Sequence, residues 1–357
     1  MAVRLRYPFA AECGVFRTTY RDELSLYQLP VSRVGLWGSI VALYLLPLVL
    51  SNYYLGVLNL VGIFAIAAIG LNVATGYTGQ ISVGHGAFMG VGAFTLGFLT
   101  TKQGWPFWPA LPVAGLAAAA VGALFGLPSA RLKGLYLAIA SIAAQIILQF
   151  VFIRAEFFTG GIHSLSVRRP ELFGHSLRSE QEFSYLVLTV ALLLGAAAQN
   201  LFRTRVGRAF IAIRDRDLAA EVMGVDLFRY KVLAFTTSAF YAGIAGALWA
   251  PYALIINPEQ FSIGLSIELL AMIIIGGLGS VLGSVFGAFF MVLLPIGVRE
   301  LASSLAAVAP VAGDKVLLLK DVAFGVAIIL FLAFEPEGLY KLWRNVKDYF
   351  KLWPFSY

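Results

Sequence analysis

The sequence predicts an all-α, polytopic membrane protein with about eight to ten transmembrane helices, some of them short or broken. Of its 357 residues, 60% are hydrophobic and only 13% are charged, and the mean hydropathy is +0.84. A soluble domain holds about 45–50% apolar and about 25% charged residues, and a disordered chain holds fewer apolar residues still. The apolar runs are continuous, as in Leu55–Leu71 and Leu111–Leu127. Strands of an outer-membrane barrel alternate instead, so helices are expected.

Ten stretches of the chain are apolar enough to cross the hydrocarbon, which takes about 20 residues per helix. Glycines at 276, 277, 279 and 283 interrupt the run 264–298, so this run is either two spans or one broken helix. The predicted helices cover 34–51, 54–75, 83–101, 107–127, 134–153, 184–202, 232–255, 264–279, 280–298 and 316–334.

Positive charge predicts how the helices are oriented. With a cytoplasmic N-terminus and ten alternating spans, 18 of the 26 Lys and Arg residues fall in cytoplasmic segments and 8 in external ones. Such an excess on the cytoplasmic side is the normal pattern in membranes. The net charge of +7 is therefore explained by the orientation of the helices in the bilayer, and no nucleic-acid partner is expected.

The chain is expected to form one membrane domain, 34–340, between two cytoplasmic tails, 1–33 and 341–357. The first tail carries scattered aromatic residues and is expected either in the cytosol or on the membrane surface. Two long connections interrupt the domain. Residues 154–183 form an external amphipathic segment, and residues 203–231 form the longest cytoplasmic connection.

Motifs for nucleotide binding, metal binding and catalysis are absent from the sequence. There is no GxxxxGK[ST] loop, and the single cysteine, Cys13, excludes a disulfide framework and a cysteine-based metal site. The three histidines, His85, His163 and His175, lie far apart along the chain. Charged residues within the spans are scarce, with Glu268 the clearest, whereas ion-driven carriers keep several. Energy for transport is therefore expected from outside the chain.

The segment 70–90 is the densest motif, and it combines many glycines with the uncharged polar residues Asn72, Gln80, Ser82 and His85. Glycine permits helix breaks and close backbone approach. A helix broken in lipid is tolerated where its freed backbone faces protein or a watery cavity. We interpret the segment as a pathway lining or gate, with tight helix packing as the alternative. For His85 alone, packing and substrate contact explain the residue equally well.

Glycine-rich stretches occur in both halves of the chain, at Gly70–Gly97 and Gly276–Gly287. An internal pseudo-repeat of the kind common in transporters and a shared small-residue composition explain this equally well. Gly276 and Gly277 are included with the predicted pathway or gate. So is Glu268, because an intramembrane acid is a functional candidate that could attract the ammonium group of a zwitterion. The alternative is a helix-end carboxylate bonded to backbone N–H groups.

The cytoplasmic segment 214–226 predicts a helix of about two turns. Asp217 is the expected N-cap and Gly224 the expected C′ residue. Leu218 and Val222 lie on one face, at i and i+4. A short helix of this kind either docks into a groove on a soluble partner or lies on lipid headgroups, and the pattern alone does not separate the two.

Several motifs of this chain then occur together, in order and at fixed spacing. They are Gly70-Leu-Asn, Thr75-Gly-Tyr-Thr-Gly-Gln-Ile-Ser-Val-Gly-His-Gly-Ala-Phe, Gly207-Arg-Ala-Phe, Ala219-Ala-Glu-Val-Met-Gly, Ser266-Ile-Glu, Gly276-Gly-Leu-Gly-Ser and Glu335-Pro-Glu-Gly-Leu. This series resembles the permease subunits of branched-chain amino acid ABC importers of the LivM type, and it runs from about residue 55 to residue 340.

The resemblance implies a multi-pass permease in the bacterial inner membrane, with both termini cytoplasmic. It implies a heterodimer with a LivH-type permease, two cytoplasmic subunits that hydrolyse Mg-ATP, and a binding protein that delivers branched-chain or related amino acids. This chain would itself bind no cofactor or metal and catalyse no reaction. The resemblance makes 214–226 the segment that couples to the ATPases, through Arg214, Asp217, Ala220, Glu221 and Gly224.

Two departures from the family pattern leave the substrate open. The family usually has Thr-Gly-Gly, a polar residue, Asn or Asp, and Gly, where this chain has Thr159-Gly160-Gly161-Ile162-His163-Ser164. This loop, with Thr159, Gly160, Gly161 and His163, is either an external entrance or a plain loop variation. Glu337 also stands where the family usually has Arg. Urea, short amides or aromatic acids are alternative cargoes, and a stand-alone secondary carrier or channel is the alternative class.

Overall fold

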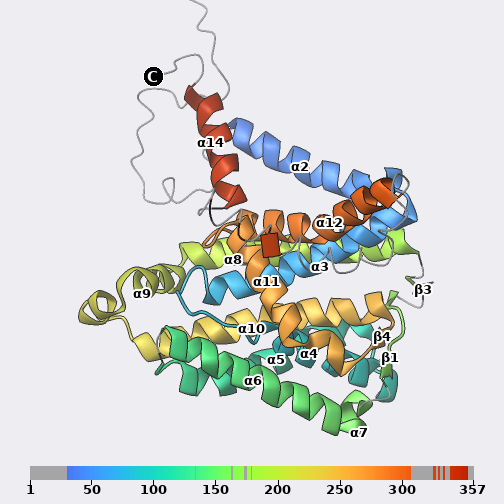
Figure 1. The fold of residues 1–357 in the computed structure, drawn as a ribbon, viewed down its shortest axis with the longest axis horizontal. Coiled ribbons are helices and arrows are strands. Elements are labelled where there is room, and N and C mark those ends of the chain that lie inside the picture. The colour runs from blue at the N-terminus through green and yellow to red at the C-terminus, as the bar shows by residue number, and fades with distance from the viewer. Residues whose placement is uncertain are drawn as a thin grey trace, which may run out of the picture.

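The structure is a computed structural model of the chain, and it describes most residues between 30 and 352. Within this part the chain is almost entirely helical, with two pairs of two-residue strands, which confirms the prediction of an all-α protein (Figure 1). The residues described are 30–132, 134–161, 164–172, 175–177, 179–306, 325, 326, 329, 333 and 338–352.

The described helices follow one another with mostly short connections. The longer ones are α2 (Pro30–Val49), α3 (Asn52–Ala74), α4 (His85–Gly97), α5 (Phe107–Ser129), α6 (Leu135–Arg154), α8 (Glu180–Arg203), α9 (Arg205–Val222), α10 (Leu227–Ala253), α11 (Ile263–Gly276), α12 (Val281–Ala306) and α14 (Leu339–Leu352). The shorter elements are a π-helical turn (Phe98–Lys102), α7 (Glu156–Thr159), the 3₁₀ turn η3 (Pro258–Phe261), β1 (Leu165–Ser166), β2 (Glu171–Leu172), β3 (His175–Ser176) and β4 (Ile255–Ile256). Strand β1 pairs with β4 and β2 pairs with β3, both antiparallel.

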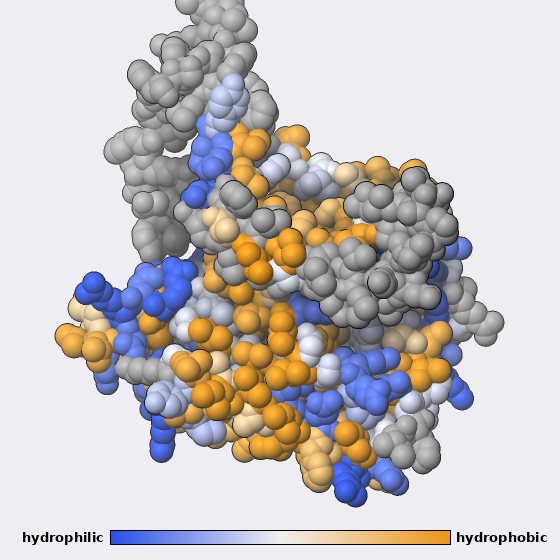
Figure 2. All heavy atoms as spheres, in the orientation of Figure 1, coloured by the Kyte–Doolittle hydropathy of each residue, from blue (hydrophilic) through white to orange (hydrophobic). Residues whose placement is uncertain are grey.

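Six of the described helices, α3, α5, α6, α8, α10 and α12, are long and apolar enough to cross a membrane, and α2 and α11 contain shorter apolar stretches. Side chains such as Leu116, Phe150 and Leu193 are exposed on the outside of the bundle. Exposed apolar surface on this scale fits lipid better than water. On the face seen in Figure 2, hydrophobic side chains cover the middle of the bundle and hydrophilic ones gather toward its ends. The chain is a polytopic helical membrane protein.

Nine of the ten predicted helices are present. The run 264–298 forms two helices, α11 and α12, and the break between them falls at 277–280. The predicted helix 83–101 begins at His85, and its last turn is π-helical. The tenth prediction, 316–334, lies almost wholly outside the described residues.

Polar capping residues set two helix starts that hydropathy alone misplaced. Ser179 and Glu182 form a capping box at the start of α8, in which each side chain meets the other residue's backbone N–H. The Asp226 side chain accepts the N–H of Arg229 at the start of α10. Both helices therefore begin earlier than predicted, because a cap satisfies N–H groups that a hydrophobic pattern does not register.

Helix α10 lies inside the bundle and packs against α3, α4 and α5. Its contact with α4 is made by backbone: a Cβ atom on Gly246 would lie 1.8 Å from the carbonyl oxygen of Met89. In lipid no hydrophobic force drives helices together, so close packing at small residues has to supply the attraction. The glycines of α4 and α10 are therefore part of the bundle's stability.

The contact between α11 and α12 is equally close. A Cβ atom on Gly276 would lie 2.0 Å from the carbonyl oxygen of Gly283, and one on Gly287 would lie 1.8 Å from that of Met272. Gly277, which follows α11, has φ +124°, a conformation that L side chains rarely adopt. The second glycine-rich stretch thus provides both a helix break and a backbone contact.

One end of the bundle, at the left of Figure 1, gathers α9 and several connections. Arg214 of α9 donates from Nη1 to the carbonyl oxygen of Gly76, at 3.1 Å, in the connection between α3 and α4. The guanidinium of Arg131, between α5 and α6, lies 5.9 Å from the centre of the Phe228 ring at the start of α10. Connections predicted to share one side of the membrane therefore contact each other.

The opposite end gathers the α4–α5 and α6–α8 connections and the residues after α10. Lys102 donates from Nζ to the carbonyl oxygen of Phe157, and the Trp108 indole donates to that of Glu171 at 3.2 Å. Strand β1 of the connection 154–183 pairs with β4, which follows α10. The described connections thus divide between two ends, as an alternating helical map requires.

Replacing Gly287 with Ala tests the backbone contact of α11 with α12. Overpacking costs about 1–3 kcal/mol, more than the ~1 kcal/mol that Ala gains over Gly in a helix. We expect Gly287→Ala to lower the Tm of the detergent-solubilised protein.

Gly195 in α8 is the matched control, because no atom lies within 4 Å of a Cβ built there. Gly195→Ala should leave the Tm unchanged or raise it. An equal rise in both variants would show that α11 and α12 are not in backbone contact.

Candidate functional site

Helix α4 begins in the interior of the bundle. At its start the backbone N–H of Val83 donates to Ser141 Oγ (2.8 Å), that of Gly86 to Ser266 Oγ (2.9 Å), and that of Ala87 to Gln145 Oε1 (2.9 Å). The first N–H groups of a helix have no partner within the helix. Here α6 and α11 supply the acceptors, so a helix start that is buried away from water is satisfied by side chains.

Gln145 and Ser266 form the centre of this network. The Ser266 hydroxyl donates to Gln145 Oε1 at 3.0 Å, and Gln145 Nε2 donates to the carbonyl oxygen of Phe261 at 2.6 Å. Both side chains have no exposed surface. The sequence interpretation did not select Gln145 or Ser141, although a polar residue inside an otherwise apolar span is a usable signal.

His85, the first residue of α4, is fully enclosed. Its Nε2 donates to the carbonyl oxygen of Ala67 at 3.2 Å, and its Nδ1 lies 3.5 Å from Ser238 Oγ. The ring also meets Phe88 edge-on, with centroids 6.4 Å apart. These contacts are with protein groups, as tight packing requires. A substrate contact at His85 stays a prediction.

Gln80 and Ser82 lie in the non-helical segment that leads into α4. Gln80 Nε2 donates to the carbonyl oxygen of Lys231 at 3.1 Å. Gln80 Oε1 and Ser82 Oγ are buried and have no hydrogen-bond partner within the described chain. An unsatisfied buried polar atom costs about 1–3 kcal/mol, which water or a passing ligand would relieve. That this segment lines a pathway or gate stays a prediction.

Asn72 joins the two glycine-rich stretches. From the end of α3, its Nδ2 donates to the carbonyl oxygen of Ser280 and to Ser284 Oγ, both at 2.8 Å. Its Oδ1 accepts the N–H of Gly279 at 2.9 Å. Gly76 is required beside it, because a Cβ there would lie 1.7 Å from Asn72 Oδ1. Asn72 thus fastens α3 to the break between α11 and α12.

Helix α9 is divided by a kink at Arg216, whose φ of −156° and ψ of 102° are not helical. The second piece therefore begins at Asp217, and Arg216 holds the N-cap position that was predicted for Asp217. The Asp217 carboxylate instead accepts the N–H of Leu218 at 2.9 Å and lies 3.8 Å from Lys231 Nζ. Attraction to Lys231 explains why this side chain turns toward α10.

The second piece of α9 ends as predicted at Gly224. This residue has φ +87°, and its N–H donates to the carbonyl oxygen of Glu221 at 2.9 Å. The N–H of Val225 donates to that of Ala220 at 3.0 Å. This pair of bonds is the Schellman motif, with Gly224 at C′.

The outer face of the second piece of α9 is apolar and exposed. Leu218, Val222 and Met223 are 68%, 88% and 85% exposed, although they lie at the polar end of the bundle. Ala220 is buried and Glu221 is exposed. Exposed apolar residues with charged neighbours are typical of a protein contact surface.

Contacts lead from α9 to α4. Arg214 is hydrogen-bonded to the carbonyl oxygen of Gly76, and Asp217 lies beside Lys231. The carbonyl oxygen of Lys231 in turn accepts a hydrogen bond from Gln80. A cavity of about 230 Å³ lies at this junction. Its lining comprises Thr78, Gly79, Gln80, Leu132, Gly134, Leu137, Ile213, Arg214, Asp215, Arg216, Asp217 and Lys231.

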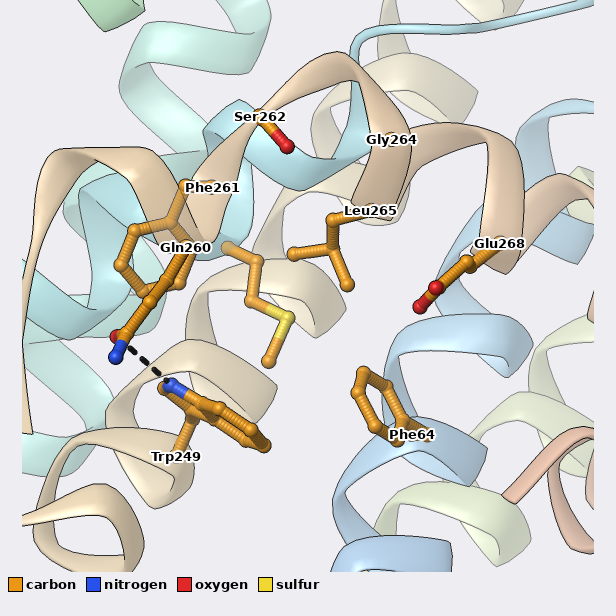
Figure 3. A pocket seen from close by; sticks show the side chains of 9 residues that line it. Phe64, Trp249, Gln260, Phe261, Ser262, Gly264, Leu265 and Glu268 are labelled. Carbon is orange, nitrogen blue, oxygen red and sulfur yellow. Dashed lines mark hydrogen bonds between the residues drawn. The ribbon is translucent and has the colours of Figure 1, made fainter. Parts of the chain in front are cut away.

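Glu268 lines a different cavity, of about 300 Å³, between α3, α4, α10, η3 and α11 (Figure 3). The carboxylate is directed into the cavity, and the Trp249 indole donates to Gln260 Oε1 at 3.4 Å on the opposite side. The other lining residues are Phe64, Met89, Phe261, Ser262, Gly264 and Leu265.

The predicted external residues form a turn. Thr159 Oγ1 lies 2.6 Å from the carbonyl oxygen of Phe152 and 2.9 Å from that of Ala155, which share its one O–H donor, and it accepts the N–H of Gly161 at 3.1 Å. Gly160 and Gly161 have φ +78° and +59°. These contacts stabilise the loop itself. His163 and Glu337 lie outside the described residues.

The predicted site residues therefore do not share one pocket. The structure divides them among the junction of α9 with the α3–α4 connection, the start of α4, the break between α11 and α12, the cavity of Figure 3, and the turn at the far end. The junction with α9 has Arg214, Asp217, Ala220, Glu221, Gly224, Gln80 and Ser82, and the start of α4 has His85. The break between α11 and α12 has Asn72, Gly276 and Gly277, and the cavity has Glu268. The turn at the far end has Thr159, Gly160 and Gly161.

Comparison with known proteins places these features in one family. A family model described as the permease component of the branched-chain amino acid transport system matches residues 53–332. The permease protein LivM of the high-affinity branched-chain amino acid transport system of Escherichia coli is 32% identical over 84% of this chain and 72% of its own length. No solved structure matches the chain.

More distant relatives are also similar. The probable branched-chain amino acid transport permease protein LivM of Methanocaldococcus jannaschii is 25% identical over 64% of this chain and 67% of its own length. The autoinducer 2 import system permease protein LsrC of Escherichia coli is 28% identical over 71% of this chain and 75% of its own length.

The family match covers more than half of the chain and runs from the second residue of α3 through the whole of α12. It contains the segments 70–90 and 203–231, and with them the buried start of α4 and the kinked α9. The chain belongs to the family of permease components of branched-chain amino acid transport systems.

Proposed function

We propose that the chain is the permease subunit of an ATP-binding-cassette importer for branched-chain amino acids and forms half of the translocation pathway. The observation that carries this proposal is the exposed apolar face of α9, joined by Arg214 and Lys231 to the segment that leads into α4. The family match supports the cargo.

In this proposal α9 is the docking element for an ATPase. The partner would hold Leu218, Val222 and Met223, whose exposure leaves them available. Movement of α9 would pull on Gly76 through Arg214 and on the connection before α4 through Lys231 and Gln80. ATP hydrolysis would thereby be converted into movement at the start of α4.

The proposed assembly contains a LivH-type permease, two ATP-binding subunits and a substrate-binding protein. The bundle end with α9 would face the cytoplasm of a bacterium, with both termini, and the end with β1 and β4 would receive the binding protein. The excess of Lys and Arg in the segments assigned to the cytoplasm supports this orientation. Mg-ATP would be bound by the partners, since the sequence has no phosphate-binding loop.

Two alternatives are distinguished by transport assays. The same architecture could import another cargo, as the name of the LsrC relative illustrates, or urea, short amides or aromatic acids. The ligand retained by the cognate binding protein decides this. Ion-driven uptake by the purified chain alone would instead identify a stand-alone carrier or channel.

Changing Leu218 and Val222 together to Asp tests the docking surface on α9. Losing two apolar anchors is expected to weaken ATPase binding about tenfold or more. Co-purification of the ATPases and uptake of leucine should both fall, while the permease stays in the membrane.

Arg208→Asp is the control for docking, because it changes an exposed residue on the first piece of α9. It should leave both readouts near the wild-type level. If the Leu218→Asp, Val222→Asp double variant binds the ATPases normally, the assignment of α9 as the docking element is wrong.

Changing Arg214 to Ala tests transmission rather than docking. The variant loses the hydrogen bond to Gly76, so we expect ATPase subunits to bind normally while ATP hydrolysed per leucine imported rises several-fold in proteoliposomes. Arg229→Ala is the control, since Arg229 is 84% exposed and its described ion pair is with Asp226, one turn away. An unchanged ratio in Arg214→Ala would rule out this route.

A further inference from the structure

The cavity of Figure 3 has the composition of a small-molecule site. Its volume of about 300 Å³ falls at the lower end of the range for ligand pockets. The wall is mostly aromatic and aliphatic, and its polar groups are few and convergent. We propose that this cavity holds the amino-acid substrate during import, as an aliphatic zwitterion. This inference rests on the proposed function and adds the binding site to it.

Glu268 would receive the ammonium group. Its carboxylate points into the cavity beside Phe64, and the side chain is half-buried on α11 (Figure 3). The Phe64 and Trp249 rings lie 5.7 Å apart on the same wall. Aromatic faces attract cations, most strongly where water is excluded, so the carboxylate and rings together favour a cationic group.

The start of α11 would receive the carboxylate. Ser262, Gly264 and Leu265 line the cavity, and Ser262 at the N-cap makes no side-chain capping hydrogen bond. The first N–H groups of a helix and its dipole favour an anion. Gly264 and Glu268 are separated by about one helical turn, roughly 6 Å along the axis. The helix therefore presents an anion-attracting and a cation-attracting group close together, as an α-amino acid requires.

Phe64, Met89, Trp249 and Phe261 complete a wall for an aliphatic side chain. This arrangement favours branched-chain amino acids over urea and short amides, which lack an ammonium group for Glu268. Met89 belongs to α4, whose start is tied to α6 and α11. Movement passed to α4 would therefore alter the wall of the cavity.

The test uses the complete importer, with its ATPases and binding protein, reconstituted in liposomes with labelled leucine. Glu268→Gln removes the charge at nearly constant shape. We expect the KM for leucine uptake to rise, or uptake to fall, about tenfold, while the subunits still co-purify as a complete complex. Glu268→Asp should recover part of the uptake. If Glu268→Gln fails to assemble, Glu268→Ala takes its place, and wild-type uptake by that uncharged variant would overturn the site.

Glu259→Gln is the matched control, because Glu259 is an exposed acid on the neighbouring 3₁₀ turn and does not line the cavity. It should transport like the wild type. If Glu268→Gln takes up leucine as well as the unaltered importer does, the cavity assignment is wrong, and the proposed function is unaffected. If the wild-type importer moves no amino acid at all, the proposed function itself is wrong.

A second, independent observation concerns α14, which crosses the direction of the long helices near the α9 end of the bundle (Figure 1). Its apolar residues Leu342, Trp343, Val346 and Tyr349 fall on one face and are exposed. The opposite face carries the basic residues Lys341, Arg344 and Lys347.

Two contacts hold α14 beside the bundle. Gly338, with φ +76°, packs against the backbone of Gly277, and the Trp343 ring lies 6.2 Å from that of Phe286. A basic amphipathic helix with Trp and Tyr that runs crosswise to the long helices matches helices that rest in the membrane interface on anionic lipid. We infer that α14 binds anionic phospholipid headgroups and buries its apolar face among the acyl chains.

Brominated lipids test this, since bromine quenches nearby tryptophan. The signal of Trp343 is the fluorescence of the full chain in nanodiscs minus that of Trp343→Phe. In the unaltered chain we expect stronger quenching by brominated phosphatidylglycerol than by brominated phosphatidylcholine. In the Arg344→Glu, Lys347→Glu double variant we expect the two lipids to quench equally. Equal quenching by both lipids in the unaltered chain would overturn the anionic preference. Absence of quenching would show that a protein partner or water covers this face.

Discussion

Satisfying the buried start of α4 is the constraint on which the rest of the structure depends. In hydrocarbon an unpaired backbone group costs several kcal/mol, so a helix can begin inside the bundle only where neighbours provide acceptors. Ser141 and Gln145 on α6 and Ser266 on α11 provide them. Those two helices must therefore pack beside α4, and one of them, α11, contributes Glu268 to the wall of the cavity.

Hydrogen bonds of the same kind join the separate elements at the α9 end of the bundle. Polar side chains tie the connection before α4 to α9, and Asn72 ties α3 to the break between α11 and α12. Each of these links is a hydrogen bond between a side chain and the backbone, so any movement must either carry both elements along or break the bond. A transporter needs this combination, because rigid helices with few joints convert a local displacement into a change of access.

Hydropathy was sufficient to predict nine helices, since crossing lipid leaves a long apolar run whatever the tertiary structure. Helix starts were less predictable, because Ser179 and Asp226 act through local caps. The site was predicted in part: Asn72, Gln80 and Glu268 are polar residues in apolar surroundings and so were visible. Gln145 acts on a helix 58 residues earlier in the chain, and the cavity draws on five separate elements. Only the fold brings such residues together.

The backbone contacts between helices have a genetic consequence. Where a side chain obstructs a substituted residue, a second mutation that shortens the obstructing side chain can restore the fit. At Gly246 and Gly287 the obstructing atom is a carbonyl oxygen, on Met89 and Met272 respectively. Every amino acid carries that oxygen, so no substitution at 89 or 272 removes it. Larger residues at these two glycines should therefore lack suppressors at the contacting position, and any rescue has to come from displacement of a whole helix.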